Sequence, residues 1–204
     1  LTRIIQGSPQ KVHLITLGPL TNVGEVLEAE PGLVINLEMI TVMGGAVEVA
    51  GNVGSSSGIE NEVAEWNIYV DPRAAAEVLD SGAPITLVPL DATNGAPVTM
   101  EFYRRLERDR TTSVAEFVYR VLAAQEQYVR SGSYYFWDPL AAAIATEEGL
   151  ATFREIPLVV VEEEGAESGR TLESERGVII RVAMTADRER FEALFLDAVN
   201  GRLP

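Results

Sequence analysis

The sequence predicts an α/β fold with a mostly parallel, open sheet, a Rossmann-like core and helices on both faces. Short apolar runs rich in β-branched residues, which are typical of buried strands, alternate with segments of helical spacing through the first half of the chain. Glycine or proline stands at most of the boundaries between these segments. No linker or internal repeat interrupts the pattern, so we expect residues 1–204 to form a single domain.

The first predicted elements are a strand, a helix and a second strand. Residues 11–17 read KVHLITL, a short apolar run that a Gly-Pro pair ends. Residues 20–30 carry apolar side chains at helical spacing, and a Pro-Gly pair ends that helix. Residues 40–43 form a second strand of the buried type, which stops at a Gly-Gly pair.

A polar loop, a helix and a third strand follow. Residues 51–61 are rich in glycine and serine and are expected to form a loop. Asp71-Pro72 predicts a helix start, with aspartate as the N-cap and proline at the first helical position. This helix is expected to run to about Ser81, and residues 84–90 form the third strand.

Helices dominate the second half of the chain. One over residues 113–130 has an apolar stripe formed by Val114, Phe117, Val118, Val121 and Leu122. The remaining predictions are helices over 98–108, 138–146 and 186–200, and strands over 158–161 and 177–183.

Composition excludes several classes of function. The net charge of −15 argues against nucleic acid as a partner, because a polyanion would be repelled. The chain has no cysteine, which excludes disulfides and thiolate chemistry. No apolar run reaches the ~18 residues of a membrane helix, so no membrane partner is expected. The first residues lack a secretory signal pattern, which together with the missing cysteine fits a cytoplasmic protein.

Two candidate ligand sites lie in loops at the carboxyl ends of strands, where open α/β sheets bind ligands. Leu17 precedes Gly-Pro-Leu-Thr-Asn, which is either a structural junction held by Thr21 or Asn22, or a backbone carbonyl that faces a metal. Met43 precedes Gly44-Gly45, which is either a plain turn or a place where the backbone approaches a ligand.

Two further candidates carry polar or aromatic side chains. Glu65 and Asn67 would point the same way in an extended segment, and a carboxylate beside an amide suits a diol. Alternatively, they belong to a solvated edge segment. Asp138 follows the aromatic run from Tyr134 to Trp137 and is either a helix N-cap beside core aromatics, or a metal ligand beside a platform for a flat ring.

Taken in order, LGPLTN, VMGGA, GN, AEWNIYVDPRAA and WDPLA resemble the nucleoside hydrolases of the inosine–uridine type. The resemblance covers nearly the whole chain, and AEWN-x-x-x-DP is its most specific element. It implies hydrolysis of the N-glycosidic bond between ribose and a nucleobase, in nucleoside salvage. It also implies Ca²⁺ as cofactor, which accepts many oxygen ligands in loose geometry and activates a water.

Carried over by position, the resemblance implies two metal ligands, the backbone carbonyl of Leu17 and the carboxylate of Asp138. It implies Asn52, Glu65 and Asn67 as ligands of the ribose hydroxyls, with Asn61 as an alternative to Asn52.

Trp137, beside Tyr134, would stack on the base and act with Asp138 in catalysis. Tryptophan stands where pyrimidine-accepting members have histidine, which resembles the purine-preferring branch. His13, the only histidine, lies mid-strand in a buried-looking stretch and is interpreted as structural.

The family's N-terminal Asp-x-Asp-x-x-x-Asp-Asp cluster and first strands have no counterpart in this sequence. The chain therefore resembles the C-terminal portion of such a domain, either as a fragment or as the product of a truncated gene. We expect it to bind calcium weakly and to be inactive alone. A non-catalytic remnant that binds a ribosyl ligand or a partner subunit is the alternative, and a homo-oligomer is left open. An unrelated Rossmann-like hydrolase is disfavoured, because the sequence has no G-x-G-x-x-G motif.

Overall fold

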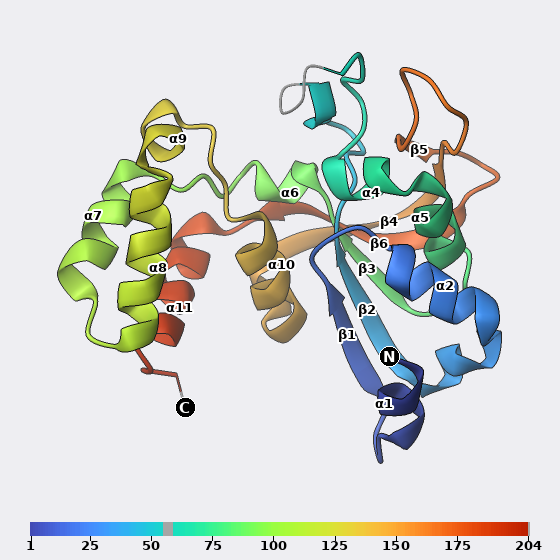
Figure 1. Ribbon diagram of the computed structural model, residues 1–204, viewed down its shortest axis with the longest axis horizontal. Coiled ribbons are helices and arrows are strands. Elements are labelled where there is room, and N and C mark those ends of the chain that lie inside the picture. Colours follow the sequence, from blue (N-terminus) through green and yellow to red (C-terminus); the bar gives the residue numbers. More distant parts are fainter. Residues whose placement is uncertain (55–58, 204) are drawn as a thin grey trace.

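The computed structural model describes residues 1–54 and 59–203, and within them one sheet has the strand order β1-β2-β3-β6-β4-β5 (Figure 1). The first three pairs in this order are parallel, and the last two are antiparallel. The α/β fold with a mostly parallel sheet is thus confirmed, with an antiparallel end that the sequence did not predict. The strands are Val12–Thr16 (β1), Leu37–Met43 (β2), Ile85–Val88 (β3), Ala151–Val160 (β4), Thr171–Glu173 (β5) and Val178–Ala186 (β6).

Helices cover both faces of the sheet. One apolar core lies under α2, α5 and η1, and the other lies under α6, α7, α8, α10 and α11. Within the described ranges, no helix is long and apolar enough to cross a membrane. The helices are Thr2–Gly7 (α1), Thr21–Ala29 (α2), Pro31–Asn36 (η1), Trp66–Val70 (α4), Pro72–Leu79 (α5), Leu90–Thr93 (α6), Met100–Asp109 (α7), Ser113–Ala124 (α8), Glu126–Ser131 (α9), Trp137–Thr146 (α10), Glu148–Leu150 (η2) and Arg188–Val199 (α11).

Two of the sequence motifs join α2 to α5. Asp71 caps α5 as predicted, and its Oδ1 accepts a hydrogen bond from the amide of Ala74 at 3.1 Å. Its Oδ2 accepts from the hydroxyl of Thr21 at 2.6 Å. Thr21 therefore binds a distant carboxylate, whereas the junction interpretation had it bind nearby backbone. A Cβ atom on Gly24 would lie 3.0 Å from that of Ala74, so glycine permits the close helix approach.

The helix predicted over residues 113–130 is divided, and only part of its predicted apolar stripe faces the core: Leu122 is buried and Val118 packs against the core, whereas Val114, Phe117 and Val121 are exposed. α8 ends at Ala124, and α9 begins at Glu126. α8 buries Ala115 and Leu122, whereas Phe117 of the predicted stripe is 67% exposed. A helix packed against two neighbours on one side buries only the side chains that face them, and the spacing does not identify that side.

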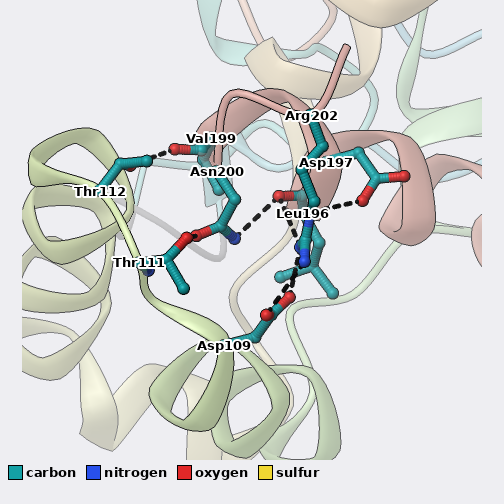
Figure 2. A network of polar contacts seen from close by, with 8 residues as sticks. All are labelled: Asp109, Thr111, Thr112, Leu196, Asp197, Val199, Asn200 and Arg202. Carbon is teal, nitrogen blue, oxygen red and sulfur yellow. Dashed lines mark hydrogen bonds and ion pairs between the residues drawn. The ribbon is translucent and has the colours of Figure 1, made fainter.

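A polar network ties the closing helix α11 to the turn between α7 and α8 (Figure 2). The side-chain oxygen of Asn200 accepts from the amide and the hydroxyl of Thr111, both at 2.8 Å. Its side-chain nitrogen donates to the carbonyl of Leu196 at 2.9 Å. Arg202 forms ion pairs with Asp109 and Asp197. This network anchors the helical layer beside the sheet.

Candidate active site

The carboxyl ends of β1, β2 and β3 are adjacent, and hydrogen bonds join the turn after β2 to α6, which follows β3. The amide of Leu90 donates to the carbonyl of Gly45 at 2.9 Å. Asp91 accepts from the amides of Val47 and Glu48 at 2.9 and 2.7 Å. Asp91 belongs to none of the motifs from which the sequence predicts a site. The turn is thereby fixed at the edge of the sheet where ligands bind in such folds.

Glu65 is the N-cap of α4, and the prediction of an extended or solvated edge segment is wrong. The residue is 2% exposed. Its Oε2 accepts from three amides, those of Gly45 at 3.1 Å, Asn67 at 2.9 Å and Ile68 at 3.3 Å. In the part of the chain that the structure describes, no donor contacts Oε1. One carboxylate oxygen is therefore fixed by three donors, and the other has none among these residues.

Burial raises the pKa of Glu65 to about 7, because water reaches the charged form poorly. The three amide hydrogen bonds lower the pKa and partly offset this effect. The negative charge of Asp138 raises it further. Glu65 and Asp138 thus lie close enough to interact, although 73 positions separate them in the sequence.

Asn67 lies in the first turn of α4 and contacts the end of β2. Its side-chain nitrogen donates to the carbonyl of Met43 at 3.1 Å and lies 3.4 Å from the sulfur of the same residue. The amide is thereby oriented, and no donor among residues 1–54 and 59–203 contacts its oxygen. Glu65 contacts the turn after β2 and Asn67 contacts the last residue of that strand, which brings these two predicted residues together.

The two asparagines considered for one role differ in their surroundings. The side-chain oxygen of Asn52 accepts from the amide of Trp66 at 2.9 Å, beside Glu65. Asn61 is buried, and its oxygen accepts from the amides of Val63 and Ala64 at 3.2 and 2.9 Å. The side-chain oxygen of Asn61 is therefore bound within its own loop, and the side chain of Asn52 lies next to Glu65. Of the loop predicted over 51–61, residues 55–58 lie outside the described residues.

The two proposed metal ligands occupy different elements. Asp138 lies in the first turn of α10, but the N-cap is Phe136, so the prediction of an Asp138 cap is wrong. Partial burial raises the pKa of Asp138, and no donor in the described ranges contacts its carboxylate. Leu17 directly follows β1, which lies at one edge of the sheet, and is 42% exposed.

Calcium needs six to eight oxygen ligands. No group of three or more His, Cys, Asp or Glu side chains in residues 1–54 and 59–203 could hold a metal ion. One carboxylate and one carbonyl do not make such a site, so the described residues alone do not fit this cofactor.

The aromatic residues before Asp138 pack against one another and against the core. The rings of Tyr134 and Trp137 meet edge to face, with centroids 5.7 Å apart. The ring of Tyr135 is tilted against Trp137 at 5.6 Å. Tyr134 and Trp137 are half-buried, and both border the core under α10. Packing and ligand contact are therefore compatible for Trp137.

His13 takes no part in this site, and the expectation that it is buried is wrong. It lies exposed on β1, where its Nε2 is 2.8 Å from the hydroxyl of Thr41 on the neighbouring strand. The alternation of side chains along an edge strand places it on the open face.

Comparison with known proteins gives a consistent result. A family model described as inosine-uridine preferring nucleoside hydrolase matches residues 1–193. The pyrimidine-specific ribonucleoside hydrolase RihA of Klebsiella pneumoniae (strain 342) is 35% identical over 121 residues, which cover 58% of this chain and 36% of that protein.

Two solved structures are similar along nearly the entire chain. An inosine-uridine preferring nucleoside hydrolase from Bacillus anthracis has a TM-score of 0.87 at 27% identity, over 99% of this chain and 64% of that one. A purine-preferring ribonucleoside hydrolase from Gardnerella vaginalis has a TM-score of 0.79 at 29% identity, over 98% and 64%. The chain therefore spans less than two thirds of each of these relatives.

Proposed function

Because the chain belongs to the inosine-uridine preferring nucleoside hydrolase family, we propose that its site binds the ribosyl part of a nucleoside and serves hydrolysis of the N-glycosidic bond. The observation that carries the proposal is the state of Glu65. A buried carboxylate with one oxygen fixed by three amides, and with no donor on the other among the described residues, is a ready acceptor for a sugar hydroxyl. Burial of a carboxylate oxygen without a hydrogen-bond donor costs free energy, and a sugar hydroxyl would offset that cost.

Asn67 and Asn52 complete the proposed ribose contacts. The side-chain oxygen of Asn67 accepts from a second hydroxyl, while its nitrogen stays bound to the carbonyl of Met43. Asn52 reaches the same sugar from its position at the amide of Trp66. A vicinal diol can donate to the carboxylate and to the amide at once, which suits ribose and disfavours a deoxyribose.

We place the base against Trp137 and Tyr134, in the layer next to Asp138. An indole cannot act as a general acid, but it can stack on a flat ring, which is worth ~1–3 kcal/mol per base in other systems. This favours purine nucleosides, which offer the larger face. The relatives include a pyrimidine-specific and a purine-preferring enzyme, so the preference rests on Trp137 alone.

The role of calcium in this chain is a separate proposal. Asp138 and the carbonyl of Leu17 would be two of its oxygen ligands, and the shell is incomplete without further carboxylates. We therefore infer weak calcium binding and no hydrolysis by residues 1–204 alone.

A non-catalytic protein that binds a ribosyl ligand or a partner subunit is the second candidate. The incomplete set of metal ligands among the described residues favours it. The two candidates share the ribose contacts and differ only in turnover, so binding and cleavage must be measured separately.

Calorimetric titration with ribose and with inosine, with and without CaCl₂, tests these proposals. We expect binding by the wild-type chain, about tenfold weaker binding by Asn67→Ala, and unchanged binding by Glu62→Gln, an exposed control in the same loop. Inosine cleavage by the wild-type chain would exclude the non-catalytic candidate. The proposed site would be overturned if wild type and Asn67→Ala bound ribose with equal affinity. It would also be overturned if neither protein bound ribose.

A further inference from the structure

The turn that supports Glu65 is held by a side chain from a distant strand. Thr171 is the first residue of β5 and is 1% exposed. Its hydroxyl accepts from the amide of Ala46 at 2.9 Å and donates to the carbonyl of the same residue at 2.8 Å. One hydroxyl thus satisfies both backbone groups of Ala46, and 125 positions separate the two residues in the sequence.

Thr171 also packs directly on the neighbouring glycine. Gly45 has a φ of +86°, a backbone conformation that residues other than glycine rarely adopt. A Cβ atom on Gly45 would lie 3.1 Å from the hydroxyl oxygen of Thr171 and 3.2 Å from its methyl carbon. The amide of Gly45 is one of the three donors to Glu65. The position of that amide therefore depends on the contact between Thr171 and the turn.

The segment that leads to Thr171 makes two further contacts with the site. The side-chain nitrogen of Asn61 donates to the carbonyl of Ser168 at 2.8 Å. A Cβ atom on Gly169 would lie 2.6 Å from the Cα of Tyr69 in α4, so only glycine permits this approach. The segment therefore contacts the loop before Glu65 and the helix that begins after it.

We propose that Thr171 is a positioning residue for the ribose contact of Glu65, a role that rests on the proposed function. It fixes the turn at Gly45 and Ala46, and the turn fixes one carboxylate oxygen of Glu65. Valine has nearly the shape of threonine, but its methyl group cannot occupy a place 2.8 Å from a carbonyl oxygen. Thr171→Val must displace the turn or leave the amide of Ala46 without a partner.

Three variants separate this role from general stability. Thr171→Val removes the hydroxyl, and Thr171→Ser keeps it. Thr86→Val is the matched control, because Thr86 is equally buried but binds Arg181 and Met39, away from the turn. Thr171→Ala replaces the valine variant if that variant does not fold.

Hydrogen exchange of the amides of Gly45 and Ala46 is the readout that does not depend on ligand. We expect about tenfold faster exchange of both amides in Thr171→Val, as for the loss of one or two hydrogen bonds. In Thr171→Ser and Thr86→Val, the exchange rates of these two amides, relative to those of the other sheet amides, should equal the wild-type values. The second readout is ribose affinity, which should fall about tenfold in Thr171→Val and recover in Thr171→Ser.

Unchanged protection of Gly45 in Thr171→Val would overturn the inference, as would faster exchange of every sheet amide to the same degree. Altered protection with unchanged ribose affinity would also overturn it. If the wild-type chain binds no ribose, the proposed function fails, and the exchange of the Gly45 amide alone decides whether Thr171 positions the turn.

Discussion

Replacing Glu65 by glutamine should stabilise the protein above neutral pH while removing the proposed sugar acceptor. Burial raises the pKa of Glu65 from 4.5 to about 7. The folded protein favours the protonated form of Glu65. The stability that this preference contributes is complete below about pH 4.5 and is lost as the pH rises through about 7.

The size of the effect follows from that difference in pKa. A change from 4.5 to about 7 corresponds to about 3 kcal/mol at ~1.4 kcal/mol per pKa unit. Glutamine cannot ionise, and its carbonyl oxygen can accept from the same three amides. Glu65→Gln should therefore exceed wild type in unfolding free energy by up to about 3 kcal/mol at about pH 8, with most of the gain absent at about pH 5.

Urea unfolding followed by tryptophan fluorescence, at both pH values, measures this difference. Glu62→Gln is the matched control, because it removes an exposed negative charge from a chain of net charge −15 without changing a buried group. A raised pKa of Glu65 would be refuted if Glu65→Gln were no more stable than Glu62→Gln at about pH 8, or if its gain in unfolding free energy were the same at about pH 5 and about pH 8.

Three further predictions concern other parts of the molecule. Trp137→Ala should weaken inosine binding about tenfold, with less effect on ribose, in calorimetric titrations; equal losses for inosine and uridine would remove the stacking hypothesis. Asn200→Ala should lower the free energy of unfolding by about 2 kcal/mol in urea denaturation, because Thr111 and Leu196 lose their partner; an effect no larger than that of an exposed asparagine would count against the network. Calcium titrated into residues 1–204 should give only weak heats, because the described residues offer an incomplete set of oxygen ligands; tight binding would contradict this prediction.

The sequence alone determined the fold class and the order of the site motifs. The spacing of apolar residues distinguishes strand-like from helical segments, and this spacing is a property of residues close together in the sequence. Local periodicity therefore predicted the parallel half of the sheet and its helices. Asp71-Pro72 predicted the start of α5 correctly, because an N-cap is a contact over three residues. The same locality placed Leu17, Met43 and the Glu65 segment at the ends of strands or in the loops beside them.

Only the tertiary structure decided how those segments meet. Glu65 and Asn67 look extended in the sequence, yet a five-residue helix, too short for periodicity to detect, joins them. The distinction between Asn52 and Asn61, and the hold of Thr171 on the turn at Ala46, depend on contacts between segments up to 125 residues apart. Such contacts arise when the entire sheet has formed, because the packing of β4, β5 and β6 sets where Thr171 lies, and no local pattern in the sequence carries that information.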